Sequence, residues 1–226
     1  MERVFIVIAA YNEERAIGDV VRRLRNSGYK DIVVVNDGSR DRTAQIAAEA
    51  GAHVVRHAIN RGQGAALRTG IEYALRKGTD IIVTFDADGQ HRVEDLSAMI
   101  LPVQNGEVDI TLGSRFLQHG SNVPAIRKLF LQAGAFLFYM LYGVRLTDSH
   151  NGFRAMSRHA AQTIDIKADK MEHASEIVDK IGRRKLRYRE VPVVIKYTEY
   201  SRAHSSQGTF PAIRILFRTL AHKFLR

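Results

Sequence analysis

Short apolar runs alternate with amphipathic segments along the first half of the chain. The runs rich in β-branched residues predict strands at residues 4–9, 31–35, 53–56, 80–85 and 109–112. Between them, apolar positions recur at helical spacing in residues 13–25, 41–50, 65–76 and 93–101. Alternating strands and helices predict an α/β fold, with a mostly parallel, Rossmann-like sheet covered by helices on both faces.

The second half is less regular. Its pattern predicts helices at residues 127–141 and 173–181, two short strands within residues 191–196, and a final helix at residues 210–224. Residues 148–154, DSHNGFR, are predicted to form a loop. We find no internal repeat and no Pro/Gly-rich linker, so the 226 residues predict a single domain, residues 1–226.

Composition narrows the class of protein. The chain is 45% hydrophobic and 26% charged, which is typical of a chain that buries a full core. It contains no cysteine, which excludes a zinc–thiolate cluster, a disulfide framework and a thiol nucleophile, and is compatible with a reducing cytoplasm. The N-terminal apolar run is short and leads directly into a polar motif, so we do not expect a secretory signal.

Positive charge is concentrated in the second half of the chain. Residues 1–112 carry 14 Lys and Arg against 16 Asp and Glu, whereas residues 113–226 carry 20 against 8. This asymmetry favours an anionic partner for the second half: nucleic acid, an anionic membrane or a phosphorylated acceptor.

Two acidic residues follow the predicted strand at residues 80–85. Asp86 and Asp88 alternate, and the amide of Gln90 comes two residues later. Such hard oxygen donors suit Mg²⁺ or Mn²⁺, particularly when a diphosphate supplies further oxygens. The alternative is an ordinary turn in which the aspartates cap the next helix. The position favours the metal site, because ligands bind at the carboxyl ends of parallel strands.

Other polar segments also end predicted strands. Tyr11 and Glu13 follow the first strand, where their side chains are candidates for binding a base and ribose. Glu13 also suits the first turn of a helix. Asp37 follows the second strand and is either a hydrogen-bond acceptor for a nucleoside or part of an Asp-Gly-Ser turn. The glycines of residues 60–64, NRGQG, would let the backbone approach a nucleotide, but a lone Gly-x-Gly is weak evidence.

Taken together, these segments resemble a known family. AAYNEE, VNDGSRDRT, NRGQGAALRTGI, DADGQH, GSRF and DSHNGFR occur in the order found in inverting GT-A glycosyltransferases. They are most similar to the branch that contains dolichol-phosphate mannose synthase and bacterial polyprenyl-phosphate glycosyltransferases. The resemblance covers residues 3–200. It implies a GT-A fold and metal-assisted transfer of a sugar from a nucleoside-diphosphate sugar.

The resemblance also implies roles for individual residues. The nucleotide pocket would be lined by Ala9, Tyr11, Glu13, Val35 and Asp37. The metal, Mg²⁺ or Mn²⁺, would be bound by Asp86, Asp88 and Gln90. Arg115 and Arg154 would face the phosphate or the acceptor, and Arg202, in a loop at residues 197–208, would reach the pyrophosphate.

The acceptor is less closely defined by the sequence. The resemblance implies a lipid-linked acceptor, either a polyprenyl phosphate or a growing cell-surface glycan. Leu131 stands where dolichol-phosphate enzymes usually have a hydroxyl residue, which argues against a lipid phosphate. A sugar hydroxyl, as in polysaccharide synthesis, would need a general base, for which Glu172 and Glu176 are candidates. Both glutamates also fit a solvated helix face.

The C-terminal segment, residues 209–226, has the pattern of a basic amphipathic helix. Such a helix can lie on an anionic membrane surface, which would suit a cytoplasmic enzyme that contacts the inner face of the membrane. Packing against the domain or against the partner in a homodimer explains the same apolar stripe.

Two other classes compete with the glycosyltransferase hypothesis. A nucleotidyltransferase would share the α/β sheet and acidic metal site, but it usually has a Gly-rich loop after the first strand, where this chain has AAYNEE. A nucleic-acid-binding protein would explain the basic half, but we find no recognisable binding module. We therefore expect a nucleoside-diphosphate sugar as partner, and no nucleic acid.

Overall fold

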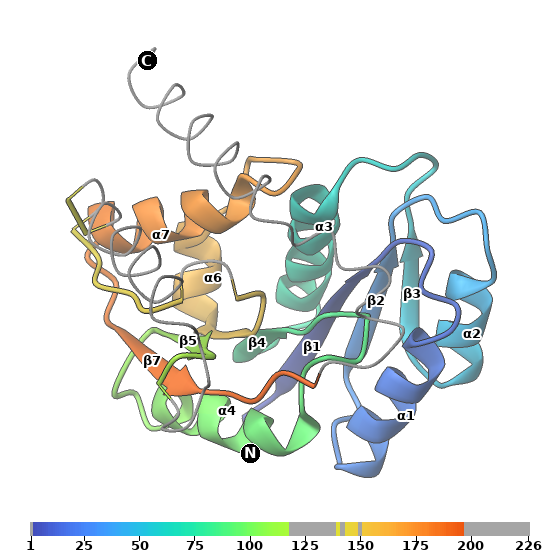
Figure 1. Ribbon diagram of the computed structural model, residues 1–226, viewed down its shortest axis with the longest axis horizontal. Coiled ribbons are helices and arrows are strands. Elements are labelled where there is room, and N and C mark those ends of the chain that lie inside the picture. The colour runs from blue at the N-terminus through green and yellow to red at the C-terminus, as the bar shows by residue number, and fades with distance from the viewer. Residues whose placement is uncertain (1, 118–138, 141–142, 149–150, 197–226) are drawn as a thin grey trace.

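The computed structural model describes residues 2–117, 139–140, 143–148 and 151–196 (Figure 1). Its centre is a seven-stranded sheet with the order β3-β2-β1-β4-β6-β5-β7. The strands are β1 (Val4–Ala10), β2 (Ile32–Asn36), β3 (His53–Arg56), β4 (Ile81–Thr84), β5 (Ile110–Ser114), β6 (Arg154–Ser157) and β7 (Tyr188–Pro192). The helices are α1 (Ile17–Asn26), α2 (Thr43–Glu49), α3 (Gln63–Arg76), α4 (Leu96–Gln104), α6 (Arg158–Ile164) and α7 (His173–Arg183), with a 3₁₀ turn at Val93–Asp95.

The sheet is parallel except for one strand. β1 pairs in parallel with β2 and β4, β2 with β3, and β5 with β7. β6 runs antiparallel to both of its neighbours, β4 and β5. The predicted α/β fold with a mostly parallel sheet is therefore confirmed.

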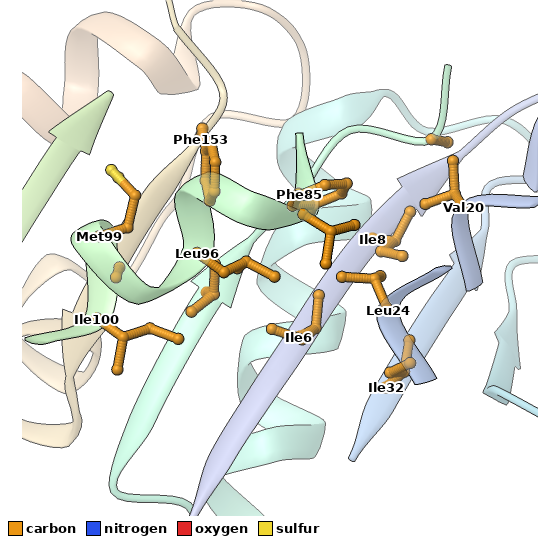
Figure 2. Close-up of a cluster of buried hydrophobic side chains, with 14 of the residues drawn as sticks. Ile6, Ile8, Val20, Leu24, Ile32, Phe85, Leu96, Met99, Ile100 and Phe153 are labelled. Atoms are coloured by element: carbon orange, nitrogen blue, oxygen red, sulfur yellow. The ribbon is translucent and has the colours of Figure 1, made fainter. Parts of the chain in front are cut away.

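Helices cover both faces of the sheet, as Figure 1 shows. On one face, α1, α2 and α4 pack over alternate residues of β1, including Ile6 and Ile8 (Figure 2). On the other face, α3 packs over β1, and α3, α6 and α7 share one core cluster with Phe5 and Val7. Because successive side chains of a strand point to opposite faces, the apolar run of β1 supplies both cores, as expected for a buried parallel strand.

The approach of α3 to the sheet depends on Gly70. A Cβ atom at this position would lie 2.4 Å from Cγ1 of Val7 and 3.2 Å from Cγ2 of Val35. The helix therefore rests on β1 and β2 at a distance that excludes a side chain. This close packing places the N-terminus of α3 near the carboxyl ends of those strands.

The first helix begins later than the prediction. It starts at Ile17, not at residue 13, because the preceding turn is bound to the 39–43 loop. Asn12 has a left-handed φ of 56°, the Glu13 N–H donates to Thr43 Oγ1 (2.7 Å) and the Glu14 N–H donates to Asp41 Oδ2 (3.1 Å). These tertiary hydrogen bonds replace the first helical turn that the acidic residues predicted.

Three further predictions in the second half need correction. Arg154, predicted to end a loop, begins β6, and the following helix α6 was missed. The Ser157 side chain accepts a hydrogen bond from the Ala160 N–H, a helix N-cap that is visible in the sequence. In place of two strands within residues 191–196 there is β7 and one isolated bridge between Ile195 and His91.

Several sequence predictions lie outside the described residues. They are most of the helix at residues 127–141, the loop with Arg202 and the C-terminal helix at residues 210–224. Within the part of the chain that the structure describes, no helix is both long and apolar enough to cross a membrane.

Candidate functional site

The polar motifs meet at one edge of the sheet. β1, β2, β4 and β5 end there, because these strands all run in the same direction. β6 runs the other way, so its first residue, Arg154, lies at this edge and pairs in register with Thr84 of β4 and Leu112 of β5. The antiparallel strand thus inserts an arginine between the ends of two parallel strands.

Asp86 and Asp88 lie just beyond β4, as the sequence predicted. The backbone of Gly152 is so close to Asp86 that a Cβ atom there would lie 2.6 Å from Asp86 Oδ1. Thr84 holds Gly152 in place by donating its hydroxyl to the Gly152 carbonyl (2.6 Å). Asp88 Oδ1 accepts a hydrogen bond from the Gln90 N–H (2.9 Å).

The two carboxylates differ in their electrostatics. Burial alone would raise the pKa of Asp86, but the nearby charges of His91 and Arg154 outweigh it and hold this pKa below its usual value. The pKa of Asp88 is raised, by burial and by the negative charge of Asp86. The pair therefore consists of one ionised carboxylate and a neighbour whose charge is disfavoured.

A divalent cation fits this pair. Carboxylate oxygens are the ligands that Mg²⁺ and Mn²⁺ prefer, and a cation would relieve the repulsion between Asp86 and Asp88. Among the described residues, no group of three or more His, Asp or Glu side chains is arranged to hold a metal. The side chain of Gln90 is partly exposed, and its role as a further ligand stays a prediction.

His91 is buried beside the acidic pair. Its Nε2 atom lies 2.8 Å from Asp86 Oδ2, although neither ring nitrogen has a partner in hydrogen-bond geometry among the described residues. The ring packs against Phe85 and Phe153, with centroids 5.3 and 4.9 Å away. The backbone around His91 is also anchored, because the Lys196 N–H donates to the Gln90 carbonyl (2.9 Å).

Arg154 has the largest fully buried side chain of the described residues and is only 2% exposed. Its Nη1 atom has no hydrogen-bond partner among the described residues. Burial lowers its pKa to about 10, against the attraction of Asp86 and Asp148. A buried guanidinium with an unsatisfied donor is costly, unless a ligand or water satisfies it. That Arg154 faces the phosphate or the acceptor stays a prediction.

Arg115 follows β5 at the same edge. Its guanidinium makes a two-pronged ion pair with Asp148, with Nε–Oδ2 and Nη2–Oδ1 distances of 2.6 and 2.8 Å. The Asp148 carboxylate is buried. Arg115, which was predicted to face the phosphate or the acceptor, therefore binds Asp148. The charge of Asp148 also acts on Arg154.

Asp37 is fully engaged within the protein. Its Oδ1 accepts hydrogen bonds from the Arg61 N–H (3.0 Å) and lies 2.7 Å from Nδ1 of His57, and its Oδ2 accepts from the Gly62 N–H (2.7 Å). The carboxylate thus shapes the loop at residues 57–62, which leads into α3. A direct contact between Asp37 and a nucleoside stays a prediction.

The other residues predicted to line the nucleotide pocket lie around the ends of β1 and β2. Ala9 and Val35 are partners in the parallel register of these strands. Tyr11 is 45% exposed beyond β1, an unusually open position for an aromatic ring. The Glu13 backbone is held by Thr43. The structure brings these residues to one edge, but their contacts with a nucleotide stay predictions.

The two candidate bases have different environments. Glu176 is bound to the preceding loop, accepting hydrogen bonds from the Lys167 and Ala168 N–H groups (3.0 and 2.8 Å) and pairing with Lys180 (2.7 Å). Glu172 stands at the N-terminus of α7 and is partly buried. Both assignments stay predictions.

His173, next to Glu172, is a buried neighbour of the site. Its Nδ1 atom lies 2.7 Å from the Lys170 carbonyl, which can only accept, so this nitrogen carries the proton. Burial and the charge of Arg154 lower the pKa of His173 to about 4. The imidazole is therefore neutral at pH 7, with its Nε2 lone pair unprotonated.

The sequence analysis missed several residues that the structure brings to the site. Asp148 and Gly152 belong to the DSHNGFR segment, but nothing in it showed that one binds Arg115 and the other abuts Asp86. Glu190 lies on β7 and binds the turn that carries Asp148. His91, within DADGQH, had no assigned role. Asp148, Gly152 and Glu190 act through neighbours distant in sequence, which local patterns do not reveal, whereas His91 contacts Asp86 of its own segment.

The sheet topology and the acidic pair at its carboxyl edge define an enzyme of the GT-A type. The sequence model of the family described as "Glycosyl transferase family 2" matches residues 5–165. The chain belongs to this family and is a glycosyltransferase, as the sequence motifs predicted.

Relatives match over nearly the whole chain. An uncharacterized protein of Methanocaldococcus jannaschii is 40% identical over 98% of this chain and 93% of its own. The UDP-N-acetylglucosamine–dolichyl-phosphate N-acetylglucosaminyltransferase of Methanococcus voltae is 34% identical over 97% of this chain and 96% of its own. The undecaprenyl-phosphate mannosyltransferase of Micrococcus luteus is 30% identical over 91% of this chain and 88% of its own.

A solved structure supports the fold. Glucosyl-3-phosphoglycerate synthase of Mycobacterium tuberculosis, crystallised with Mn²⁺, UDP-glucose and phosphoglyceric acid, superimposes with a TM-score of 0.71. The match covers 97% of this chain and 78% of that chain, at 19% sequence identity. At this identity the likeness establishes the GT-A fold alone.

Proposed function

We propose that this enzyme transfers a sugar from a nucleoside-diphosphate sugar to a polyprenyl or dolichyl phosphate, with inversion at the anomeric carbon. The observation that carries the proposal is the buried Arg154, with an unsatisfied Nη1 atom, beside the Asp86 and Asp88 pair at the carboxyl edge of the sheet. The site thus combines the carboxylate oxygens of Asp86 and Asp88, which suit a cation, with the buried positive charge of Arg154, which suits an anion. Two of the relatives above are named for lipid-phosphate acceptors.

On the donor side, the 57–62 loop held by Asp37 and the ends of β1 and β2 would bind the nucleoside. Asp86, Asp88 and Gln90 would hold Mg²⁺ or Mn²⁺ at the pyrophosphate. A cation bound there supplies Lewis-acid stabilisation of the charge that develops on the leaving diphosphate. Arg202 would add positive charge from the loop at residues 197–208.

On the acceptor side, an oxygen of the lipid phosphate attacks the anomeric carbon from the face opposite the diphosphate. The bond from the anomeric carbon to the β-phosphate oxygen breaks, and its electron pair leaves with the nucleoside diphosphate. A phosphate acceptor is already anionic, so the chain's task is to position it, which we assign to Arg115 and Arg154. An acceptor hydroxyl would instead need a base, for which Glu172 and Glu176 are the two candidates.

The test is a transfer assay with purified full-length protein and dolichyl or undecaprenyl phosphate in detergent micelles. UDP-N-acetylglucosamine, UDP-glucose and GDP-mannose are supplied with Mn²⁺ or Mg²⁺, and the lipid-linked sugar is measured. We expect one donor to be used, and Asp88→Ala to reduce transfer by about 10²- to 10³-fold, as when a group that stabilises developing charge is lost. Asp19→Ala, at an exposed helical position, is the matched control.

Other outcomes would contradict the proposal. Full metal-dependent transfer by Asp88→Ala would contradict the assigned cation site. Transfer to a glycan hydroxyl, but not to a lipid phosphate, would identify polysaccharide synthesis as the function. Release of pyrophosphate from a nucleoside triphosphate would instead identify a nucleotidyltransferase.

We also propose that the enzyme works at the cytoplasmic face of a membrane through residues 209–226, whose sequence is basic and amphipathic. Co-sedimentation with vesicles that contain anionic lipid is expected for the full chain and not for a chain ending at residue 208. Equal sedimentation of the two chains would contradict this role of the segment.

A further inference from the structure

Glu190 on β7 binds the turn at residues 147–148. Its Oε1 accepts hydrogen bonds from the Thr147 N–H (2.8 Å), the Thr147 hydroxyl (3.0 Å) and the Asp148 N–H (3.0 Å). Its Oε2 also accepts from the Thr147 N–H (2.9 Å). One carboxylate thus fixes the backbone of two successive residues.

The same turn holds Arg115. Asp148 accepts hydrogen bonds from Nε and Nη2 of Arg115 at 2.6 and 2.8 Å, and from its backbone N–H at 3.2 Å. The Thr147 hydroxyl lies 2.6 Å from Oγ of Ser114, the residue before Arg115. The side chain and the backbone at the end of β5 are therefore both set by residues 147–148.

We propose that Glu190 is a positioning residue for sugar transfer: it holds residues 147–148 so that Asp148 fixes the Arg115 guanidinium at the acceptor side of the site. This inference rests on the proposed role of Arg115. The charge of Asp148 also acts on Arg154, so the turn connects Glu190 with both arginines of the site.

The chemistry of Glu190 supports this role over a purely stabilising one. Burial, together with the charge of Asp148, raises the pKa of Glu190, so the ionised form is held against the preference of its surroundings. A partly buried carboxylate placed beside a second carboxylate is an expensive way to stabilise a turn. It is an effective way to orient a turn, because a glutamate in the middle of β7 can accept from successive N–H groups of the same turn.

The first test compares Glu190→Ala with Glu190→Gln in the transfer assay. The alanine variant is expected to lower kcat/KM for the lipid phosphate by about 10- to 100-fold, because a shift of about 1 Å in a positioned group has effects of this size. The KM for the sugar nucleotide should not change. The glutamine variant is expected to stay within about threefold of wild type, because its amide oxygen can take the place of Oε1 and its three hydrogen bonds.

Glu107→Ala is the matched control, since Glu107 pairs with Arg189, the neighbour of Glu190 on β7, and lies away from the turn. It is expected to leave transfer unchanged. A double-mutant cycle with Arg115→Ala shows whether Glu190 acts through Arg115. In the Arg115→Ala background, adding Glu190→Ala should lower kcat/KM by less than about twofold further. Independent, multiplying losses in the two variants would overturn the proposal.

A readout without substrate separates this proposal from the proposed function. The Nε–H group of Arg115, paired with Asp148, should give an NMR signal that exchanges slowly with water in the wild type, in Glu190→Gln and in Glu107→Ala. Glu190→Ala should accelerate this exchange at least tenfold, and Glu190→Asp, which keeps the charge but shortens the reach, should do so partially. An unchanged signal in both Glu190→Ala and Glu190→Asp would overturn the positioning role, even if no lipid acceptor is found.

Discussion

His91 presents its Nε2 atom to Oδ2 of Asp86 at 2.8 Å, and its ring packs against those of Phe85 and Phe153, which also contact each other. The imidazole therefore touches a predicted metal ligand while its ring belongs to the core. Loss of an outer group that orients a metal ligand typically lowers metal affinity by about 10- to 100-fold. We assign His91 to this positioning of Asp86.

Replacing His91 by phenylalanine tests the assignment, because the substitution keeps an aromatic ring in the Phe85–Phe153 contact and removes the ring nitrogens. We expect melting temperature to change little and Mn²⁺-dependent affinity for UDP or GDP to fall by about 10- to 100-fold. Calorimetric titration of UDP or GDP, with and without Mn²⁺, measures this affinity. His159→Phe, on helix α6, is the control. Wild-type affinity in a folded His91→Phe protein would contradict the assignment.

Gly152→Ala should displace Asp86. The added Cβ would lie 2.6 and 2.9 Å from the two carboxylate oxygens, closer than such atoms approach in proteins. We expect Mn²⁺-dependent nucleotide affinity to fall by about tenfold or more, since the ligand must rotate or the backbone must shift. Gly28→Ala meets no atom within 4 Å but has a φ of 92°, so it should lower stability and leave affinity intact. Unaltered nucleotide binding by Gly152→Ala would show that Asp86 is free to move.

Gly70→Ala should destabilise the fold although alanine favours helices. The gain in helix propensity is about 1 kcal/mol, whereas overpacking against Val7 and Val35 costs about 1–3 kcal/mol. Urea unfolding measures the difference. In a Val7→Ala background the clashing Cγ1 atom is absent, so the same substitution should cost less. An equal cost in both backgrounds would contradict the packing explanation.

The ion pair between Asp109 and Arg187 should make stability depend on acid pH. Hydrogen bonds from the Arg187 side chain and backbone N–H hold the pKa of Asp109 below its usual 3.8. Because the folded pKa is the lower one, this contribution is complete above about pH 3.8 and is lost as the pH falls through the folded value. Asp109→Asn should therefore melt below wild type at pH 7, with the gap closing under strong acid. A gap independent of pH would contradict this origin.

The elements predicted from hydrophobic periodicity were recovered where a segment's own pattern decides its structure. β1 is apolar throughout, and β2 and β4 are apolar up to their last residues, Asn36 and Thr84, since these strands are buried on both faces of the sheet. The errors occur where distant contacts decide. The turn before α1 is held by Thr43 and Asp41, and β6 exists because it fits between β4 and β5.

The candidate site divides in the same way. The Asp86 and Asp88 pair was predictable, since its position follows from the strand before it and from the rule that ligands bind where parallel strands end. The partners of this pair were not predictable. Gly152 and Arg154 reach Asp86 only because an antiparallel strand reverses the chain at that edge. His91 reaches Asp86 from the same DADGQH segment, with its ring packed against Phe153.

By itself, the sequence determined the fold class, the family and the carboxylates proposed to hold the cation, because periodicity and local motifs encode them within a few residues. Only the tertiary structure decided which charges face one another. Asp37 and Glu176 accept hydrogen bonds from backbone N–H groups of neighbouring loops. Glu190 binds the turn of Asp148, which in turn binds Arg115. The physical reason is that a carboxylate's role depends on the donors within about 3 Å of it, and packing, not sequence order, brings those donors close.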